Sequence, residues 1–368
     1  MERFIEHSES CHEKEASSYF VKITDPVAKK ALWEGFIEKG SSKVRVVAAD
    51  YFTHDSTIRF EKTRTEASIN LATWIESLRI YSLTATALPV LATIAFVSSF
   101  GATIDWLTAI TAFIGAVTLQ LSVNLLNDVE DHLRLIDFPG GPGGAGVIQK
   151  GLLTAKQIHK LGIIAFVVGA GLGLPALLKN PIEIFMIGLI AVLGTYGYSS
   201  GVGFKYKALG DLVVFLLCGP LLTAGASFAA TGVLSAEVLW LGAFFGFAAV
   251  GILHVNNMQD IELDSSRSAK TLASLLGFGL SRWFLVSIYL VAILCLFIAT
   301  FEHPQFSWAT AALLPSVLLA AGLIKKIFKA SGCQSPHLQG ARVKAAQLHL
   351  VAGSLVTVYF FVSKALGV

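Results

Sequence analysis

Charged residues are scarce in this chain of 368 residues. They make up 14% of it, whereas soluble globular proteins carry about 25%. The net charge at pH 7 is only +3, so we expect no nucleic-acid partner. The four cysteines show no CxxC or paired spacing, which disfavours a disulfide framework and a zinc site. These scarcities make an ordinary cytosolic enzyme a poor fit.

Hydrophobic residues, in contrast, make up 54% of the chain, and the mean hydropathy is +0.67. The charges that exist are spread unevenly. Residues 1–78 hold 11 Lys and Arg and 13 Asp and Glu, whereas the following 290 residues hold 17 and 12. The composition therefore predicts a short soluble segment followed by a membrane protein.

Long apolar runs follow one another from about residue 79 onward. A bilayer core is crossed by about 20 apolar helical residues. Nine stretches meet this criterion, near 80–100, 105–126, 158–178, 182–199, 210–232, 236–256, 279–300, 306–324 and 344–364. We therefore predict an all-α integral membrane protein with nine transmembrane helices.

The basic residues predict which ends of these helices face the cytoplasm. With nine spans, the loops after the even-numbered spans share one side with the N-terminal segment. Of the 17 Lys and Arg after residue 78, only Lys179 and Lys364 fall on the opposite side. By the positive-inside rule, the N-terminus and the even-numbered loops are cytoplasmic. We expect the protein in the inner membrane of a bacterium.

Acidic residues of the membrane part gather in two short stretches. Seven of its 12 Asp and Glu lie in residues 128–137 and 260–264, after the second and sixth spans. Acidic residues in or near hydrocarbon are functional candidates by default, because their burial is costly. Their matching places, four helices apart, suggest two similar halves.

The spacing within each stretch puts the polar side chains on one helical face. The pairs Asn124/Asp128, Asn127/Asp131, Asn256/Asp260 and Asp260/Asp264 are all four residues apart. Like charges at this spacing repel, so a cation should neutralise them. Carboxylates with amide neighbours suit Mg²⁺, which binds through one or two carboxylates and substrate phosphates. Two such sets facing one cavity would hold a diphosphate through bridging metal ions.

Two other interpretations compete with a metal site. A single acidic pair at a helix end is more often a solvated terminus, although two matching Asn- and Asp-rich sets are harder to explain in that way. A cation-coupled carrier would also hold carboxylates at a repeat interface. A carrier should place them inside broken spans, not at the cytoplasmic ends.

These residues also resemble a known family. NDVED, preceded by Asn124, resembles the first Asp-rich motif of the UbiA-type membrane prenyltransferases, and NNMQDIELD resembles the second. Several further segments resemble the branch that acts on 1,4-dihydroxy-2-naphthoate: Gly146–Thr154, Tyr198, Leu209–Asp211, Gly219–Pro220, Asp260–Gly277 and Ala346–Leu350. The likeness covers roughly residues 72–368, which we expect to form the membrane prenyltransferase domain.

The resemblance implies a fold, a reaction and a cofactor. It implies nine helices around a central cavity and transfer of a polyisoprenyl chain from its diphosphate to a small aromatic acceptor, with Mg²⁺. In the closest branch the acceptor is 1,4-dihydroxy-2-naphthoate, which also loses its carboxylate and gives demethylmenaquinone. The alternatives within the family are 4-hydroxybenzoate, homogentisate or another aromatic compound. Oligomeric state and prenyl chain length stay open.

The resemblance also implies roles for individual residues. Asp128, Asp131, Asp260 and Asp264 would hold the metal and act in catalysis, and Lys270 would neutralise the diphosphate. The substrate-binding candidates are Asn124, Asn127, Asp137, Gln149, Tyr198, Lys205, Asn257, Gln347 and His349. A polar residue inside a span more often bonds to a neighbouring helix, so Gln347 and His349 depend most on the resemblance.

The N-terminal segment, residues 1–71, matches no family pattern. Residues after Asp25-Pro26 predict a short amphipathic helix with Ala31, Leu32, Phe36 and Ile37 on one face. KVRVVAADYF, residues 43–52, has the composition of a strand. We expect a small cytoplasmic extension without an assigned role.

Overall fold

A computed structural model of the chain describes residues 18–39, 41–52, 54–63, 75, 78–137, 146–266, 269–306 and 308–367. The chain separates into two compact units. Unit 1 contains Met1–Ile80 and Leu121–Ile164, and unit 2 contains Tyr81–Gln120 and Ala165–Val368. Each unit is therefore built from two separate stretches of sequence.

Unit 1 contains four strands and a short helix, together with parts of two helices that both units share. They are β1 (Ser18–Lys22), α1 (Pro26–Glu34), β2 (Phe36–Lys39), β3 (Ser42–Phe52), β4 (Thr57–Lys62), α4 (Trp106–Leu133) and α5 (Ala155–Leu172). The helices of unit 2 are α3 (Thr84–Ser99), α6 (Leu174–Lys179), α7 (Pro181–Ser199), α8 (Gly210–Cys218), α9 (Pro220–Thr231), α10 (Ala236–Gln259), α11 (Ile261–Ser266), α12 (Leu272–Thr300), α13 (Leu314–Lys329) and α14 (Ala341–Leu366). Short 3₁₀ turns connect several of them.

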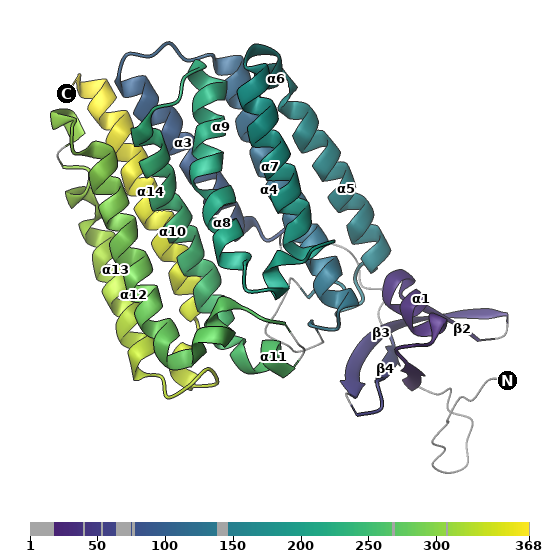
Figure 1. The fold of residues 1–368 in the computed structure, drawn as a ribbon. Coiled ribbons are helices and arrows are strands. Elements are labelled where there is room, and N and C mark those ends of the chain that lie inside the picture. The colour runs from purple at the N-terminus through teal and green to yellow at the C-terminus, as the bar shows by residue number, and fades with distance from the viewer. Residues whose placement is uncertain are drawn as a thin grey trace. The chain divides into compact units, whose positions relative to one another are not determined.

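The N-terminal part of unit 1 is a four-stranded antiparallel sheet with one helix (Figure 1). The strand order is β1-β4-β3-β2. Ile37, Ile58 and Phe60 are almost fully buried between the sheet and α1. This segment is thus an ordered small domain, which we call the sheet domain (residues 18–62).

Helix α1 is shorter than its sequence pattern predicts. Asp25 caps it by accepting a hydrogen bond from Val27 N, and Pro26 is its first residue, as expected. The helix ends at Gly35, whose φ of 71° is the left-handed conformation that glycine adopts at helix ends. Phe36 and Ile37 therefore belong to β2, and their placement on the helix face was wrong. The strand predicted for residues 43–52 is confirmed as β3.

The helices that follow are those of a membrane protein. Eight of the described helical segments are long and apolar enough to cross a bilayer, and α3 is a shorter apolar helix of 16 residues. Together they occupy the nine positions predicted from the sequence. Large apolar side chains point outward from them, such as Leu178 and Ile182, each at least 73% exposed. An exposed apolar surface of this kind is suited to lipid.

Helix α10 is the central helix of unit 2. In its most apolar stretch 72% of the residues are buried, more than in any other span among the described residues. It contacts α3, α8, α9, α12 and α14, and these helices run side by side in Figure 1. At one end, Phe96, Phe306 and Phe360 pack with ring centroids 5.0–5.4 Å apart. The C-terminal end of α10 is held by a second cluster, in which Val255 and Met258 pack with Leu285.

A glycine-proline pair divides the span made of α8 and α9. A Cβ atom on Gly219 would lie 2.6 Å from the carbonyl oxygen of Gly242 and 2.8 Å from the Cα of Gly246, both on α10. Only glycine permits this approach, and small residues allow close helix packing in membranes. Gly219 and Pro220 therefore serve the packing of α10.

Candidate active site

The first acidic motif occupies the last three turns of α4, in unit 1. Asn124, Asn127, Asp128 and Asp131 are all buried, with at most 8% of each residue exposed. Asn127 donates a hydrogen bond from Nδ2 to Oδ2 of Asp131 at 3.0 Å. Because α4 is continuous over these positions, the four polar side chains share one face, as their spacing predicts.

Asp128 is held by an arginine from the segment that precedes the first span. The guanidinium of Arg79 forms an ion pair with Oδ1 of Asp128. Arg79 has a φ of 48°, an uncommon left-handed conformation for a residue other than glycine. Next to it, Asn124 donates to the carbonyl oxygen of Leu78 at 3.1 Å. The turn at Leu78 and Arg79 thus neutralises the motif and holds it in place.

Two further candidates lie close to this motif in the chain. Asp137 is buried, and its backbone N donates to the carbonyl oxygen of Asp131 at 3.3 Å, so the chain turns back toward the motif. Gln149 lies in the turn of residues 146–152 and is only 8% exposed. Its Nε2 is buried and has no hydrogen-bond partner among the described residues. A buried amide donor of this kind is suited to bind a ligand oxygen.

The second acidic motif lies at the end of α10, in unit 2. Asn257 and Asp264 are buried, and Asp260 is partly buried. Asp260 follows the last helical residue with φ −100° and ψ 7°, and a new short helix, α11, begins directly after it. The expectation of one uninterrupted helical face is therefore wrong here. The backbone hydrogen bond from Asp264 N to Asp260 O, at 2.8 Å, still keeps these two residues one turn apart.

An arginine also neutralises the second motif. Arg342, at the start of α14, forms an ion pair with Oδ1 of Asp260 at 2.5 Å and donates a second hydrogen bond to Gln259 Oε1. Gln259 donates in turn to the carbonyl oxygen of Leu338 at 2.6 Å. Each acidic motif thus has one aspartate paired with an arginine from a distant part of the sequence.

The two candidate lysines of unit 2, Lys205 and Lys270, lie in two backbone segments that are joined by hydrogen bonds. Lys270 N donates to Tyr206 O at 3.1 Å, and Ala208 N donates to Lys270 O at 2.7 Å. Lys205 is the residue before Tyr206, so both candidates belong to one paired segment. Tyr198 lies nearby, since a Cβ on Gly210 would be 3.7 Å from its ring and 3.4 Å from Lys205 Cα.

The two candidates on α14 lie on different faces of the helix. Gln347 is exposed, whereas His349 is 2% exposed and its ring lies 6.3 Å from that of Phe245. Residues two apart on a helix do not face each other. Both nitrogens of His349 are buried without a partner among the described residues. Of this pair, His349 is the better candidate for contact with a ligand.

Sequence reasoning missed Arg79 and Arg342, and it missed a buried pair formed by His254 and Asp211. His254 Nδ1 lies 3.4 Å from Asp211 Oδ1, and both residues are buried. A usable signal existed for the arginines, because a guanidinium at the edge of an apolar span requires a counter-charge. No spacing rule could have predicted which aspartate pairs with each arginine.

The donor atoms of both motifs fit Mg²⁺. Carboxylate and amide oxygens are the hard ligands that this ion prefers, and it commonly takes only one or two protein carboxylates. Within the described part of the chain, no group of three or more His, Cys, Asp or Glu side chains forms a complete metal site. Such a sparse set suits an ion whose remaining ligands come from substrate phosphates and water.

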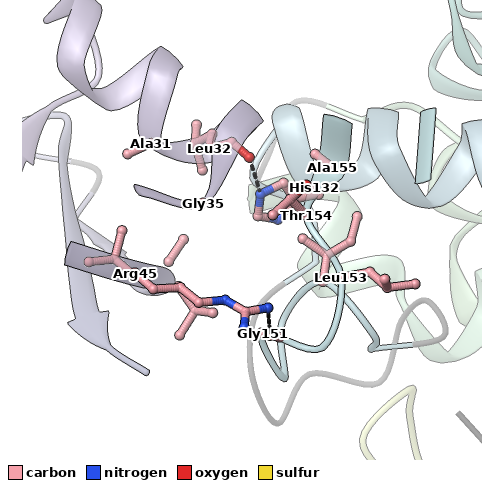
Figure 2. A pocket seen from close by; sticks show the side chains of 13 residues that line it. Ala31, Leu32, Gly35, Arg45, His132, Gly151, Leu153, Thr154 and Ala155 are labelled. Atoms are coloured by element: carbon pink, nitrogen blue, oxygen red, sulfur yellow. Dashed lines mark hydrogen bonds between the residues drawn. The ribbon is translucent and has the colours of Figure 1, made fainter. Parts of the chain in front are cut away.

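One small cavity in unit 1 is not a substrate site. It measures about 20 Å³ and lies among Leu32, Gly35, Arg45, His132 and Thr154, as Figure 2 shows. A cavity of this size has room for about one water molecule. It marks a packed contact between the sheet domain and the end of α4.

Comparison with known proteins decides the family. A model of the UbiA prenyltransferase family matches residues 87–336. The chain belongs to this family. The match includes both acidic motifs and confirms the resemblance that NDVED and NNMQDIELD indicate. As a UbiA-family protein with apolar helices, it is an integral membrane protein.

Several named proteins are similar to this UbiA-family chain. It is 29% identical over 214 residues to the UbiA prenyltransferase domain-containing protein 1 homolog of Drosophila melanogaster, covering 57% of this chain and 59% of that protein. It is 29% identical over 210 residues to the 1,4-dihydroxy-2-naphthoate octaprenyltransferase of Haemophilus influenzae, covering 55% and 68%. The alignment thus spans only about three fifths of the fly protein's length.

A solved structure shares the fold. The UbiA homolog from Archaeoglobus fulgidus bound to GPP and Mg²⁺ superimposes with a TM-score of 0.56 at 14% sequence identity, covering 77% of this chain and 99% of that one. The UbiA-like helical fold expected from the resemblance is therefore confirmed. The small sheet of residues 18–62 is an addition that the expectation did not contain.

Proposed function

We propose that this protein transfers a polyisoprenyl chain from its diphosphate to a small aromatic acceptor, with Mg²⁺. The observation that carries the proposal is the pair of matching acidic motifs, each buried or half-buried at a helix end and each paired with an arginine. Family membership and the relatives' names support the same reaction. Asp128 and Asp131 in the first motif, and Asp260 and Asp264 in the second, are the proposed metal ligands.

The ion would supply positive charge to the departing diphosphate, which gains negative charge as the allylic C–O bond breaks. Residues of the chain hold the proposed metal ligands in position. Arg79 and Arg342 hold Asp128 and Asp260 in fixed positions, so their carboxylates need not reorganise when the substrate binds. Asn127 orients Asp131 in the same manner. We propose that Asn124 and Asn257 bind diphosphate oxygens or metal-bound water.

The lysines add charge without a metal. Lys270 and Lys205 belong to one backbone-paired segment. We propose that they neutralise diphosphate oxygens during bond cleavage. Tyr198, next to Lys205, offers an aromatic face that can stabilise the allylic cation. The surrounding apolar helices exclude water, which would otherwise capture that cation.

For the acceptor we propose 1,4-dihydroxy-2-naphthoate. The bond from the prenyl C1 to the diphosphate breaks, and a bond forms from C1 to the ring carbon that bears the carboxylate. The carboxylate then leaves as carbon dioxide, and its bonding electrons return to the ring. The similar proteins of Haemophilus influenzae, Mycobacterium tuberculosis and Escherichia coli are named for this acceptor. Gln149, Asp137, Gln347 and His349 are the proposed substrate-binding residues beyond the acidic motifs.

We also propose that the motif ends of the helices face the cytoplasm, in a bacterial inner membrane. The strong bias of Lys and Arg toward one set of loops supports this orientation. A single cysteine introduced near Lys325 should be reached only by reagents that cross the membrane. Labelling of intact cells by a membrane-impermeant maleimide would contradict the orientation.

The test of the reaction is an assay of membranes containing the protein. Geranylgeranyl diphosphate or a longer diphosphate is supplied with Mg²⁺ and a panel of aromatic acceptors, and products are identified by mass spectrometry. A prenylated, decarboxylated naphthoquinol supports the full proposal. Product from a benzoate or homogentisate alone overturns the acceptor. Gradient-dependent flux of a solute without any prenylated product would favour the carrier.

A further inference from the structure

The sheet domain shares its hydrophobic core with the end of helix α4. Leu135, two residues after α4, is buried in the same cluster as Leu32, Ile58 and Phe60 of the sheet domain. Leu133 packs against this cluster as well. All of these residues belong to unit 1. The domain is therefore packed onto the chain segment that leaves the first acidic motif.

Helix α1 of the sheet domain contacts both α4, which carries the first acidic motif, and α5. The His132 Nε2 atom lies 3.1 Å from the carbonyl oxygen of Leu32, which is a hydrogen bond when that nitrogen carries the proton (Figure 2). His132 is the neighbour of Asp131, a proposed metal ligand. Beside it, Glu34 pairs with Lys156 at 3.1 Å, and Trp33 contacts the ring of His159 at the start of α5.

Strand β3 reaches the turn that contains Gln149. The guanidinium of Arg45 donates to the carbonyl oxygen of Gly151 (Figure 2). It also donates to the carbonyl oxygen of Leu152 at 3.3 Å. These are charge-assisted hydrogen bonds to two consecutive carbonyls, which fix a backbone more firmly than neutral ones. Arg45 thus ties residues that lie 106 positions apart in the sequence.

The turn itself packs closely against the sheet domain and against Thr63, the residue that follows this domain. Gly151 has a φ of 68°, and a Cβ there would lie 2.5 Å from Thr63 Cγ2 and 3.0 Å from Val47 Cγ1. Backbone hydrogen bonds from Lys150 to Gly146 and from Leu152 to Val147, at 2.9 and 3.0 Å, close the turn. A cavity of only about 20 Å³ remains at the contact. The turn's conformation therefore depends on what lies against it.

We propose that the sheet domain is a positioning element of the transferase site, and that Arg45 is its positioning residue for the turn carrying Gln149. The inference rests on the proposed function, because it assigns the domain a role in that reaction. Arg45 touches backbone carbonyls, not substrate, and acts by holding the buried Gln149 amide in one orientation. A segment without any family pattern thereby becomes part of the catalytic unit.

The first test is hydrogen exchange of the full-length protein in detergent, which needs no substrate. In Arg45→Met, the amides of residues 147–152 should exchange about tenfold faster than in the wild type, since a charge-assisted hydrogen bond is lost. Arg59→Met is the matched control, because Arg59 lies in the same sheet and pairs with Glu61 on its own strand. Equal exchange of residues 147–152 in all three proteins would overturn the proposal.

The second test asks whether Arg45 acts through Gln149. Arg45→Met should lower kcat/KM about tenfold, mainly by raising the KM of one substrate, as Gln149→Leu should do. The double variant should be no worse than Gln149→Leu alone, because the two residues act in series. Additive losses, or a kcat/KM equal to that of Arg59→Met, would contradict a positioning role.

Two further comparisons keep the outcomes distinct. If Arg45→Met does not fold, Arg45→Lys retains one donor group, and faster exchange of residues 147–152 supports the proposal whereas wild-type exchange overturns it. Suppose that the wild type forms no prenylated product even though Arg45→Met speeds hydrogen exchange of residues 147–152. In that case the proposed function is wrong, and the contact between Arg45 and the turn is confirmed. If the wild type is active but residues 147–152 exchange equally fast in Arg45→Met, only the positioning role is overturned.

Discussion

The two acidic motifs are alike in sequence and differ in how they are supported. The first lies within one continuous helix, and its neutralising Arg79 precedes Asp128 by 49 residues. The second crosses a break between α10 and α11, and its Arg342 follows by 82 residues, on another membrane helix. The same pairing of aspartate and arginine thus occurs once on a continuous helix that packs against the sheet domain, and once at a break between two helices, with the arginine on a membrane span.

The Arg–Asp ion pair of the first motif is also more buried than that of the second. The side chains of Arg79 and Asp128 are 18% and 11% exposed, whereas those of Arg342 and Asp260 are 26% and 19% exposed. A more buried charge loses more when its partner is removed, because less water can replace the partner. The first motif should therefore be the more sensitive of the two to loss of its arginine.

The largest effect is expected from removing the proposed metal ligands. Asp128→Ala and Asp260→Ala should each lower kcat by about 100- to 1000-fold, since each removes charge directed at the leaving group. Glu130→Gln and Glu262→Gln are matched controls, because these carboxylates pair with Arg134 and Cys333 instead. Activity is measured by product formation at saturating Mg²⁺. Near-normal turnover in either aspartate variant contradicts the metal assignment.

Removing the arginines should separate the two motifs. Arg79→Met is expected to lower stability by about 2 kcal/mol, because it leaves Asp128 buried without its counter-charge. Arg342→Met should cost less, since Asp260 is more exposed. Thermal unfolding of the purified protein in detergent measures both. If Arg342→Met lost as much stability as Arg79→Met, or more, burial of the ion pair would not govern the difference.

Loss of a lysine should have an intermediate effect, confined to catalysis. Lys270→Met should lower kcat/KM for the prenyl diphosphate about tenfold, as expected for one charge-assisted contact. Lys207→Met serves as the control, because Lys207 is exposed and forms the backbone bridge with Lys270. Steady-state kinetics with varied diphosphate distinguishes them. Equal values for the two variants would remove Lys270 from the site.

The smallest effect concerns the sheet domain, which packs against the end of the first motif's helix. The hydrogen bond from Lys156 holds the pKa of the Glu34 carboxyl below its usual value of 4.5. A carboxyl with a lowered pKa stabilises the folded state above its unfolded pKa, and this contribution is lost as the pH falls through the folded value. Glu34→Gln should therefore be slightly less stable than the wild type at pH 7, and the difference should shrink as the pH falls below 4.5 and vanish below the folded-state pKa. Unfolding temperatures at several pH values measure this, and a difference that grows in acid would contradict it.

Much of the fold was accessible from the sequence. The nine apolar stretches and the strand of residues 43–52 correspond to observed elements, because hydropathy and strand composition act over short windows. Errors arose where a single residue interrupts a pattern. Gly35 ends α1 before Phe36, and Asp260 ends α10 before Ile261, since the local backbone conformation outweighs the helical periodicity of the sequence.

The sequence by itself determined the membrane spans, the two acidic motifs and the need for positive charge beside them. These features depend on local composition and on helical spacing, which any window of sequence contains. Only the tertiary structure decided that Arg79 and Arg342 supply the charge, and that Arg45 reaches the turn of Gln149. Contacts between residues so far apart arise from packing of whole elements, and no sequence period encodes them.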